Sequence, residues 1–64
     1  MTLFTVHFEK GWRVGTRSLH MEHVEAPSVK AAVKLAKAAF KEAGFRLTKV
    51  DHFDEETGRL VLDW

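Results

Sequence analysis

The sequence lacks cysteine altogether, so it can form neither disulfides nor the cysteine-based zinc sites of other small proteins. Its four glycines are scattered, which excludes a glycine-rich phosphate-binding loop. No apolar run approaches the ~20 residues that a membrane-spanning helix needs. Met1–Phe8 alternates in polarity, whereas a signal peptide would carry an apolar core. The missing thiols suit a reducing compartment, and we expect a cytoplasmic protein without a membrane segment.

A large excess of either charge is also missing. The 64 residues include 10 Lys+Arg and 9 Asp+Glu, a formal net charge of +1 that excludes a histone-like polycation. Hydrophobic residues make up 45% and charged residues 30%, which is typical of a folded domain and not of a disordered tail. We therefore expect one compact domain over residues 1–64, stabilised by dense packing around its five Phe and two Trp residues.

The hydrophobic periodicity predicts an α+β domain of order β-β-α-β-β. The predicted strands are Thr2–Lys10, Arg17–Glu25, Leu47–Phe53 and Arg59–Trp64, and the predicted helix is Val29–Ala43. Ser28 is the expected helix N-cap, and Gly44 is placed to end the helix. The simplest packing lays one helix on a four-stranded, mainly antiparallel sheet. Strand orders 2-1-4-3 and 1-2-4-3 both remain open.

One helix can cover only one face of such a sheet, so the other face is either solvated or a partner surface. The side chains expected to meet the helix are Phe4, Val6, Phe8, Leu19, Met21, Leu47, Leu60 and Leu62. On the second strand, this places His20 and Glu22 on the far face. Val24 breaks the alternation, which indicates a bulge or a strand end near His23. Trp64 is in register with the last two leucines and is expected at the core or its edge.

A row of lysines follows one side of the predicted helix. Lys30, Lys34, Lys37 and Lys41 are spaced i, i+4, i+7 and i+11, so all four project from one strip. A solvated face is one interpretation, and a ridge matched to phosphates or acidic side chains is the other. Like charges at this spacing cost a few tenths of a kcal/mol per pair, and a purely structural helix would more often include Glu. The four lysines are therefore candidate partner-binding residues.

A second candidate surface lies near the first predicted turn. Trp12, Arg13 and Arg17 combine an aromatic ring with guanidinium groups, which is typical of protein hot spots and also of stacking on unpaired bases. Charge is also divided along the chain. Residues 1–44 carry seven basic and four acidic residues, and residues 45–64 carry three basic and five acidic residues. Such a dipolar surface suits orientation on a charged partner.

Four histidines are many for this length: His7, His20, His23 and His52. None lies on the predicted helix, so the two-histidine helical spacing of zinc proteases is absent. His7 and His20 share the predicted far face with Glu9 and Glu22, which together could hold a transition metal. Solvated surface histidines are much commoner, and we expect no metal and no cofactor.

Catalytic motifs are not evident. There is no Gly-x-Ser-x-Gly elbow, and a cysteine nucleophile is impossible. His52 adjoins Asp51, but neighbouring strand residues point to opposite faces and would not act together. So short a chain also struggles to enclose a substrate pocket. We expect no enzymatic activity.

The segment from His23 to Ala36 runs from a strand ending in Glu-Ala, through Pro-Ser, into an alanine-rich helix. In this organisation the chain is similar to small phage-encoded accessory proteins, including some anti-CRISPR proteins. The resemblance implies a non-catalytic inhibitor that occupies a surface of a host nucleic-acid-processing machine, and it transfers no functional residues.

The sequence therefore predicts a non-catalytic protein-binding module, and the resemblance implies a phage-type inhibitor. The alternative is a small nucleic-acid-binding domain that uses the helical lysines. Self-association through the uncovered sheet face or an edge strand is compatible with both functions.

Overall fold

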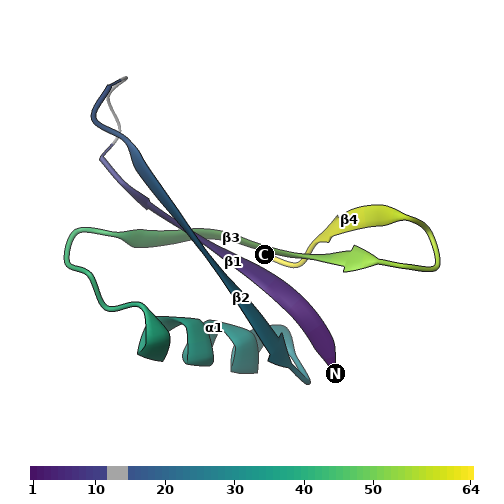
Figure 1. Cartoon of the computed structure of the whole chain (residues 1–64). Helices are drawn as coiled ribbons and strands as arrows, with labels where there is room; N and C mark the ends of the chain where they lie inside the picture. Colours follow the sequence, from purple (N-terminus) through teal and green to yellow (C-terminus); the bar gives the residue numbers. More distant parts are fainter. Residues whose placement is uncertain (12–14) are drawn as a thin grey trace.

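The computed structural model describes residues 1–11 and 15–64. These residues form β1 (Thr2–Lys10), β2 (Ser18–Ala26), α1 (Val29–Ala39), β3 (Arg46–Asp54) and β4 (Arg59–Leu62). The strands make one antiparallel sheet of order β2-β1-β3-β4, and α1 lies across one face of it (Figure 1). The α+β class and element order predicted from the sequence are confirmed. The strand order is neither of the two that the sequence left open.

β1 occupies the interior of the sheet because it carries the strongest apolar alternation. Phe4, Val6 and Phe8 are all buried beneath the helix. β1 pairs with β2 without interruption from Thr2–Ala26 to Lys10–Ser18, so the bulge expected near His23 is not there. The irregularity lies instead between β1 and β3, where His7 faces Lys49 but Phe8 faces Leu47. The extra residue is Thr48, whose hydroxyl donates to the carbonyl oxygen of His7 at 3.3 Å.

The core is built where α1 approaches the sheet over small side chains. Its buried residues are Phe4, Val6, Phe8, Ala26, Ala32, Ala36 and Val50. Ala32 and Ala36 are fully buried on α1, while Val6 and Val50 are fully buried on neighbouring strands. Alanine at the contact lets the helix axis approach closely, and the valines fill the space beneath it.

The helix begins as predicted and ends earlier than predicted. Ser28 is the N-cap, and its hydroxyl oxygen accepts a hydrogen bond from the Ala31 amide at 3.2 Å. The last helical residue is Ala39, because Phe40 adopts an extended backbone at φ −123°. The Phe40 ring then packs 5.2 Å from Phe8 and 5.0 Å from Phe45. Burial in this aromatic cluster offsets the helical hydrogen bonds that residues 41–43 would have made.

The two faces of β2 are the reverse of the prediction. Pairing places His20 beside Phe8 and Glu22 beside Val6, so both side chains lie on the helix side. The His20 ring stacks on Phe40 with centroids 3.8 Å apart. Leu19 and Met21 consequently point away from the helix and are 70% and 54% exposed. The cause is the hairpin register, because shifting a strand by one residue moves its whole apolar set to the other face.

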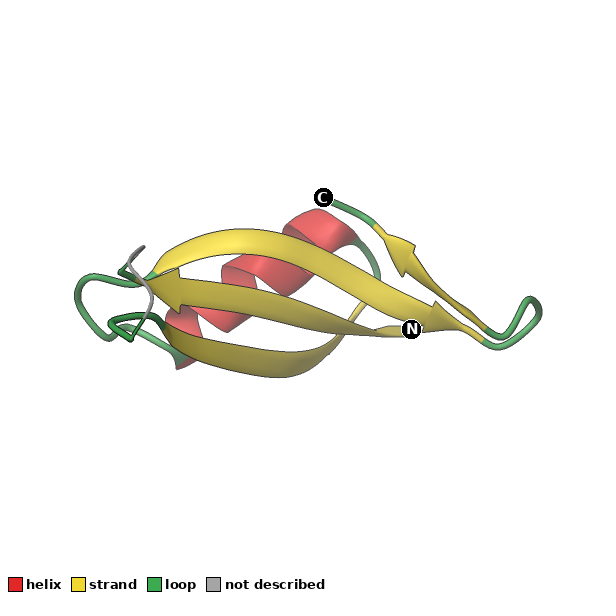
Figure 2. Cartoon of the chain, turned by 90° about the horizontal axis from the view of Figure 1, so that it is seen from above, coloured by secondary structure: helices red, strands yellow, loops and turns green. Residues whose placement is uncertain are grey.

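Leu60 and Leu62 also lie on the side away from the helix, against expectation. Leu60 pairs with Phe53 and Leu62 pairs with Asp51, and both leucines are largely exposed. The helix packs mainly on β2 and β1, and the β3–β4 hairpin extends beyond it (Figures 1 and 2). An eleven-residue helix is only about 16 Å long, which explains why it leaves β4 uncovered. Trp64 follows the end of β4 and lies beside Val29 and Val33, at the edge of the core.

Candidate functional site: the open face of the sheet

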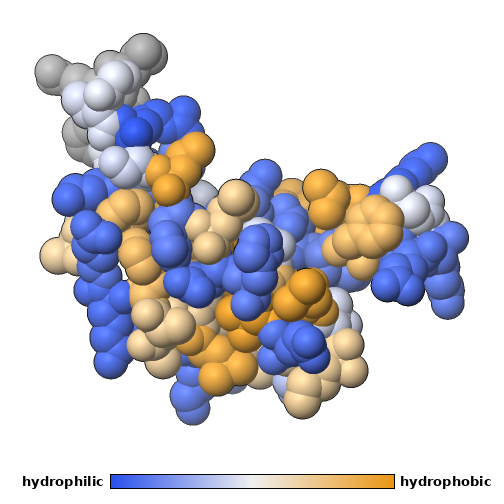
Figure 3. All heavy atoms as spheres, viewed as in Figure 1, coloured by the Kyte–Doolittle hydropathy of each residue, from blue (hydrophilic) through white to orange (hydrophobic). Residues whose placement is uncertain are grey.

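The side of the sheet opposite α1 carries an unusual share of large apolar side chains. We call it the open face, and strand alternation and register assign its residues. They are Leu3, Thr5, His7, Glu9, Leu19, Met21, His23, Glu25, Arg46, Lys49, Asp51, Phe53, Leu60 and Leu62. The large apolar residues among them are all more than half exposed: Leu3, Leu19, Met21, Phe53, Leu60 and Leu62. The space-filling view shows hydrophobic residues reaching the surface between hydrophilic ones, with a hydrophilic tip at the β3–β4 turn (Figure 3).

A buried carboxylate lies at the centre of the open face. Asp51 is 8% exposed, and its Oδ2 is 3.0 Å from Nε2 of His7. The contact between these two side chains links β1 to β3 in addition to the backbone pairing. Lys49 is the residue of β3 directly opposite His7. A buried carboxylate with a hydrogen-bond partner is stably held, so the polar centre of the face has a defined geometry. Apolar residues of β2 and β4 flank it on both sides.

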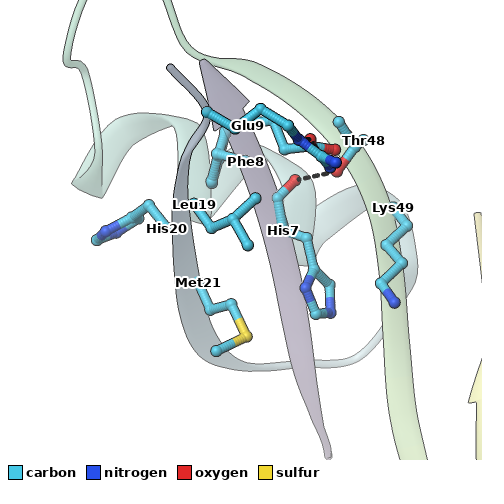
Figure 4. Close-up of a pocket in the computed structure, with 9 residues that line it drawn as sticks. His7, Phe8, Glu9, Leu19, His20, Met21, Thr48 and Lys49 are labelled. Carbon is cyan, nitrogen blue, oxygen red and sulfur yellow. Dashed lines mark hydrogen bonds and ion pairs between the residues drawn. The ribbon is translucent and has the colours of Figure 1, made fainter. Parts of the chain in front are cut away.

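A shallow hollow of about 490 Å³ lies between β2 and β3 on this face. His7, Leu19, Met21 and Lys49 stand together around it, and the ring of His20 lies apart from them (Figure 4). Among the residues that line the hollow, Thr48 carries the sole hydroxyl, and that hydroxyl already donates to a backbone carbonyl. The hollow therefore combines apolar walls with both signs of charge and does not bring a free hydroxyl to His7.

One of the residues predicted to bind a partner lies at the rim of the open face. Arg17 precedes β2, and its Nε donates to Oε1 of Glu9 at 2.8 Å, with a second bond from Nη2 to the same oxygen. Arg17 also lines the hollow beside Leu19. Trp12 and Arg13, the other members of that predicted surface, lie outside the described residues.

Only three of the four lysines predicted to form a row lie on the helix. Lys30, Lys34 and Lys37 are exposed on α1, on the opposite side of the molecule from the open face. Lys41 lies beyond the end of the helix, so the row of four at helical spacing is not formed. Lys37 and Lys41 instead line a groove with Trp64. The lysines and Arg17 therefore do not form one surface.

The His/Glu cluster considered as a metal site in the sequence is not assembled, because His7 and His20 lie on opposite faces of the sheet. His20 Nε2 lies 2.6 Å from Oε1 of Glu22 on the helix side. Within residues 1–11 and 15–64, no three His, Asp or Glu side chains come together as metal ligands.

Neighbouring residues Asp51 and His52 do point to opposite faces, as the sequence predicted. Asp51 bonds to His7 on the open face, whereas His52 Nδ1 lies 2.5 Å from Oδ2 of Asp63 on the helix side. His52 also makes an edge contact with the buried Phe4 ring. These two residues therefore belong to separate hydrogen-bonded pairs and do not act as a unit.

In the described part of the chain, no helix has the length and apolarity required to cross a membrane. Comparison with models of protein families, with curated proteins and with solved structures finds no match to this chain. Its function must therefore be argued from its own surface.

Proposed function

We propose that this chain is a non-catalytic protein-binding module whose docking surface is the open face. The clustering of exposed apolar residues on one side of the sheet carries the proposal. Isolated apolar residues on a surface are ordinary, whereas a gathered patch marks an interaction site. Leu19 and Met21 lie on one side of the His7–Asp51 pair, and Leu60 and Leu62 lie on the other.

The composition of the open face suits a protein better than a nucleic acid. Protein interfaces combine apolar anchors, often Met and aromatic residues, with a few fixed polar groups. Met21 and Phe53 supply such anchors. The His7 side chain supplies a polar group whose position is fixed by its contact with the buried Asp51. Basic and acidic residues are interleaved on this face, where Arg17 is held by Glu9 and Lys49 shares β3 with Asp51, so the face offers phosphates no continuous row of positive charge.

The resemblance to phage-encoded accessory proteins adds a partner class to this proposal. It favours an inhibitor that covers a surface of a host nucleic-acid-processing machine. The alternative, direct nucleic-acid binding by the helical lysines, has less support because Lys41 has left the helix.

Affinity capture with paired variants tests the docking surface. The immobilised chain is compared with the variant Leu60→Ser/Leu62→Ser and with the control Ala38→Ser, which alters an exposed residue on α1. All three positions are exposed, so we expect the fold to persist. We expect a defined protein to be retained by the wild type and the control and lost by the β4 double variant. With the purified partner, the double variant should bind at least about tenfold more weakly, as for anchor residues worth more than ~1 kcal/mol.

Two results would contradict the proposal. One is equal loss of the captured protein from the control and from the β4 double variant. The other is capture of nucleic acid in place of a protein, in an amount that falls as the salt concentration rises. In that case the β4 double variant would still bind the nucleic acid, and Lys34→Glu/Lys37→Glu would not. The second result would establish the alternative function.

A further inference from the structure

The outer edge of β2 is long, regular and without a pairing strand among the described residues. β2 pairs with β1 and, within the described residues, with no other strand. It contains neither Lys, Pro nor Gly between Ser18 and Ala26, and its register with β1 has no bulge. The opposite edge of the sheet, β4, has four residues to the nine of β2. Proteins usually guard free edges with short strands, bulges, lysine, proline or other charged side chains. Of these devices β2 has only its glutamates and histidines, whose charges a second copy can match.

We infer that β2 pairs with β2 of a second copy of this chain, antiparallel, about a two-fold axis at Met21. Such a dimer joins two four-stranded sheets into one continuous sheet and is isologous, so each contact occurs twice. The inference concerns the edge of the sheet and stands apart from the docking function proposed for its open face. The charged residues of β2 select a second copy of the chain and the register of the pairing, and the apolar flank of α1 is consistent with both.

The register with Met21 on the axis is self-complementary in charge. Residues directly opposite each other in an antiparallel pair lie on the same face. On the open face, Leu19 then meets His23 of the partner subunit, and Arg17 meets the partner's Glu25. On the helix side, His20 meets the partner's Glu22. Each glutamate of β2 therefore faces an imidazole or a guanidinium group.

Neighbouring registers lack this match. An axis at Glu22 places that carboxylate directly opposite its own copy, and like charges in this position are destabilising. An axis at His20 sets the imidazole against its copy and Arg17 against the partner's His23. An axis at His23 leaves Glu22 facing the partner's Val24 without a basic group. Charge therefore selects the register centred on Met21.

The helix also presents an apolar flank toward the β2 edge. Its C-terminal end overlies β2, where Phe40 stacks on His20, and α1 crosses the sheet diagonally (Figure 2). Lys37 lies on the other flank, in the groove with Phe45 and Trp64. Leu35 is about 200° around the helix from Lys37, so it lies on the β2 flank. The two-fold axis therefore brings the half-exposed Leu35 of each copy toward the interface and keeps Lys37 away from it.

Single-cysteine cross-linking tests this register cleanly because the chain has no cysteine of its own. At the axis, Met21→Cys places two thiols on directly opposed residues, whose Cα separation of about 4.5–5.5 Å falls within the range of disulfides. In Leu19→Cys the two copies lie about 13 Å apart along the strands. Leu60→Cys, on the exposed β4 edge, is the second control. Under mild oxidation, we expect a covalent dimer from Met21→Cys and monomer from both controls.

Sedimentation of the unmodified chain provides a readout that needs no cross-link. We expect twice the monomer mass at micromolar concentration and a return to monomer in Met21→Lys, which places two ammonium groups face to face on the axis. Leu60→Lys should stay dimeric, and circular dichroism verifies that both lysine variants are folded. A monomeric wild type across this range overturns the inference. Cross-linking of Leu19→Cys or Leu60→Cys as efficient as that of Met21→Cys overturns it equally.

Discussion

Replacement of Phe8 by alanine is expected to remove most of the free energy of unfolding of this protein. Phe8 is 5% exposed, and its ring packs against Phe40 and His20. Truncation of a buried phenylalanine costs about 3–5 kcal/mol, from lost transfer free energy and the cavity left behind. Folded domains have only ~5–15 kcal/mol in total, and a domain this small lies near the lower bound.

Urea unfolding followed by circular dichroism measures this loss. Phe53→Ala is the matched control because it removes the same ring from an exposed position on the open face. We expect the control to change the free energy of unfolding by no more than about 0.5 kcal/mol. Equal losses in the free energy of unfolding in the two variants would show that Phe8 is not a core residue.

Enlargement of Ala36 to leucine is expected to destabilise the fold although leucine is a good helix former. Ala36 is fully buried where α1 lies on the sheet, above the fully buried Val6 and Val50. Additional methyl groups at such a contact push the helix away from the sheet, at a cost of about 1–3 kcal/mol.

The matched control is Ala38→Leu, at an exposed position on the same helix. It makes the same change in side chain and helix propensity without meeting the sheet, so we expect a shift within about 0.5 kcal/mol. The difference between the midpoints of urea unfolding of the two variants isolates the packing contribution. An Ala36→Leu variant as stable as Ala38→Leu would place the close contact of α1 elsewhere.

Features set by local chemistry could be predicted from the sequence. The alternation of β1 fixed its bounds, and Ser28 marked the start of the helix. Gly58 marked the last turn and has a positive φ of 69°. The end of the helix was not predictable in this way, because Phe40 leaves it for contacts with Phe8 and His20, which are distant in the chain.

The faces of β2 could not be predicted from its own pattern. Alternation shows which residues share a face and does not show which face meets the helix. β2 has an apolar pair in each phase, Leu19 with Met21 and Val24 with Ala26, and pairing with β1 selects the second for the core. The sequence indicated that the uncovered face could be a partner surface, but its apolar character was missed because Leu19, Met21, Leu60 and Leu62 had been assigned to the core.

One signal in the sequence could have located the open face. The helix has alanine at its central buried positions, Ala32 and Ala36, and a short helix of this kind buries little area. It could not cover the large apolar residues of four strands at once. The excess apolar residues had to lie elsewhere, and the face without a helix was the place available.

The most direct test is to determine which face of β2 meets the helix by nuclear Overhauser contacts in solution. The docking surface depends directly on this orientation, because the orientation decides which residues of β2 lie on the open face. We expect contacts between the ring protons of His20 and Phe40, whose centroids are 3.8 Å apart, and none from the Leu19 methyl groups to the methyl groups of Ala32 or Ala36. Contacts from Leu19 to those alanines, with none between His20 and Phe40, would contradict the assignment and return the apolar residues of β2 to the core.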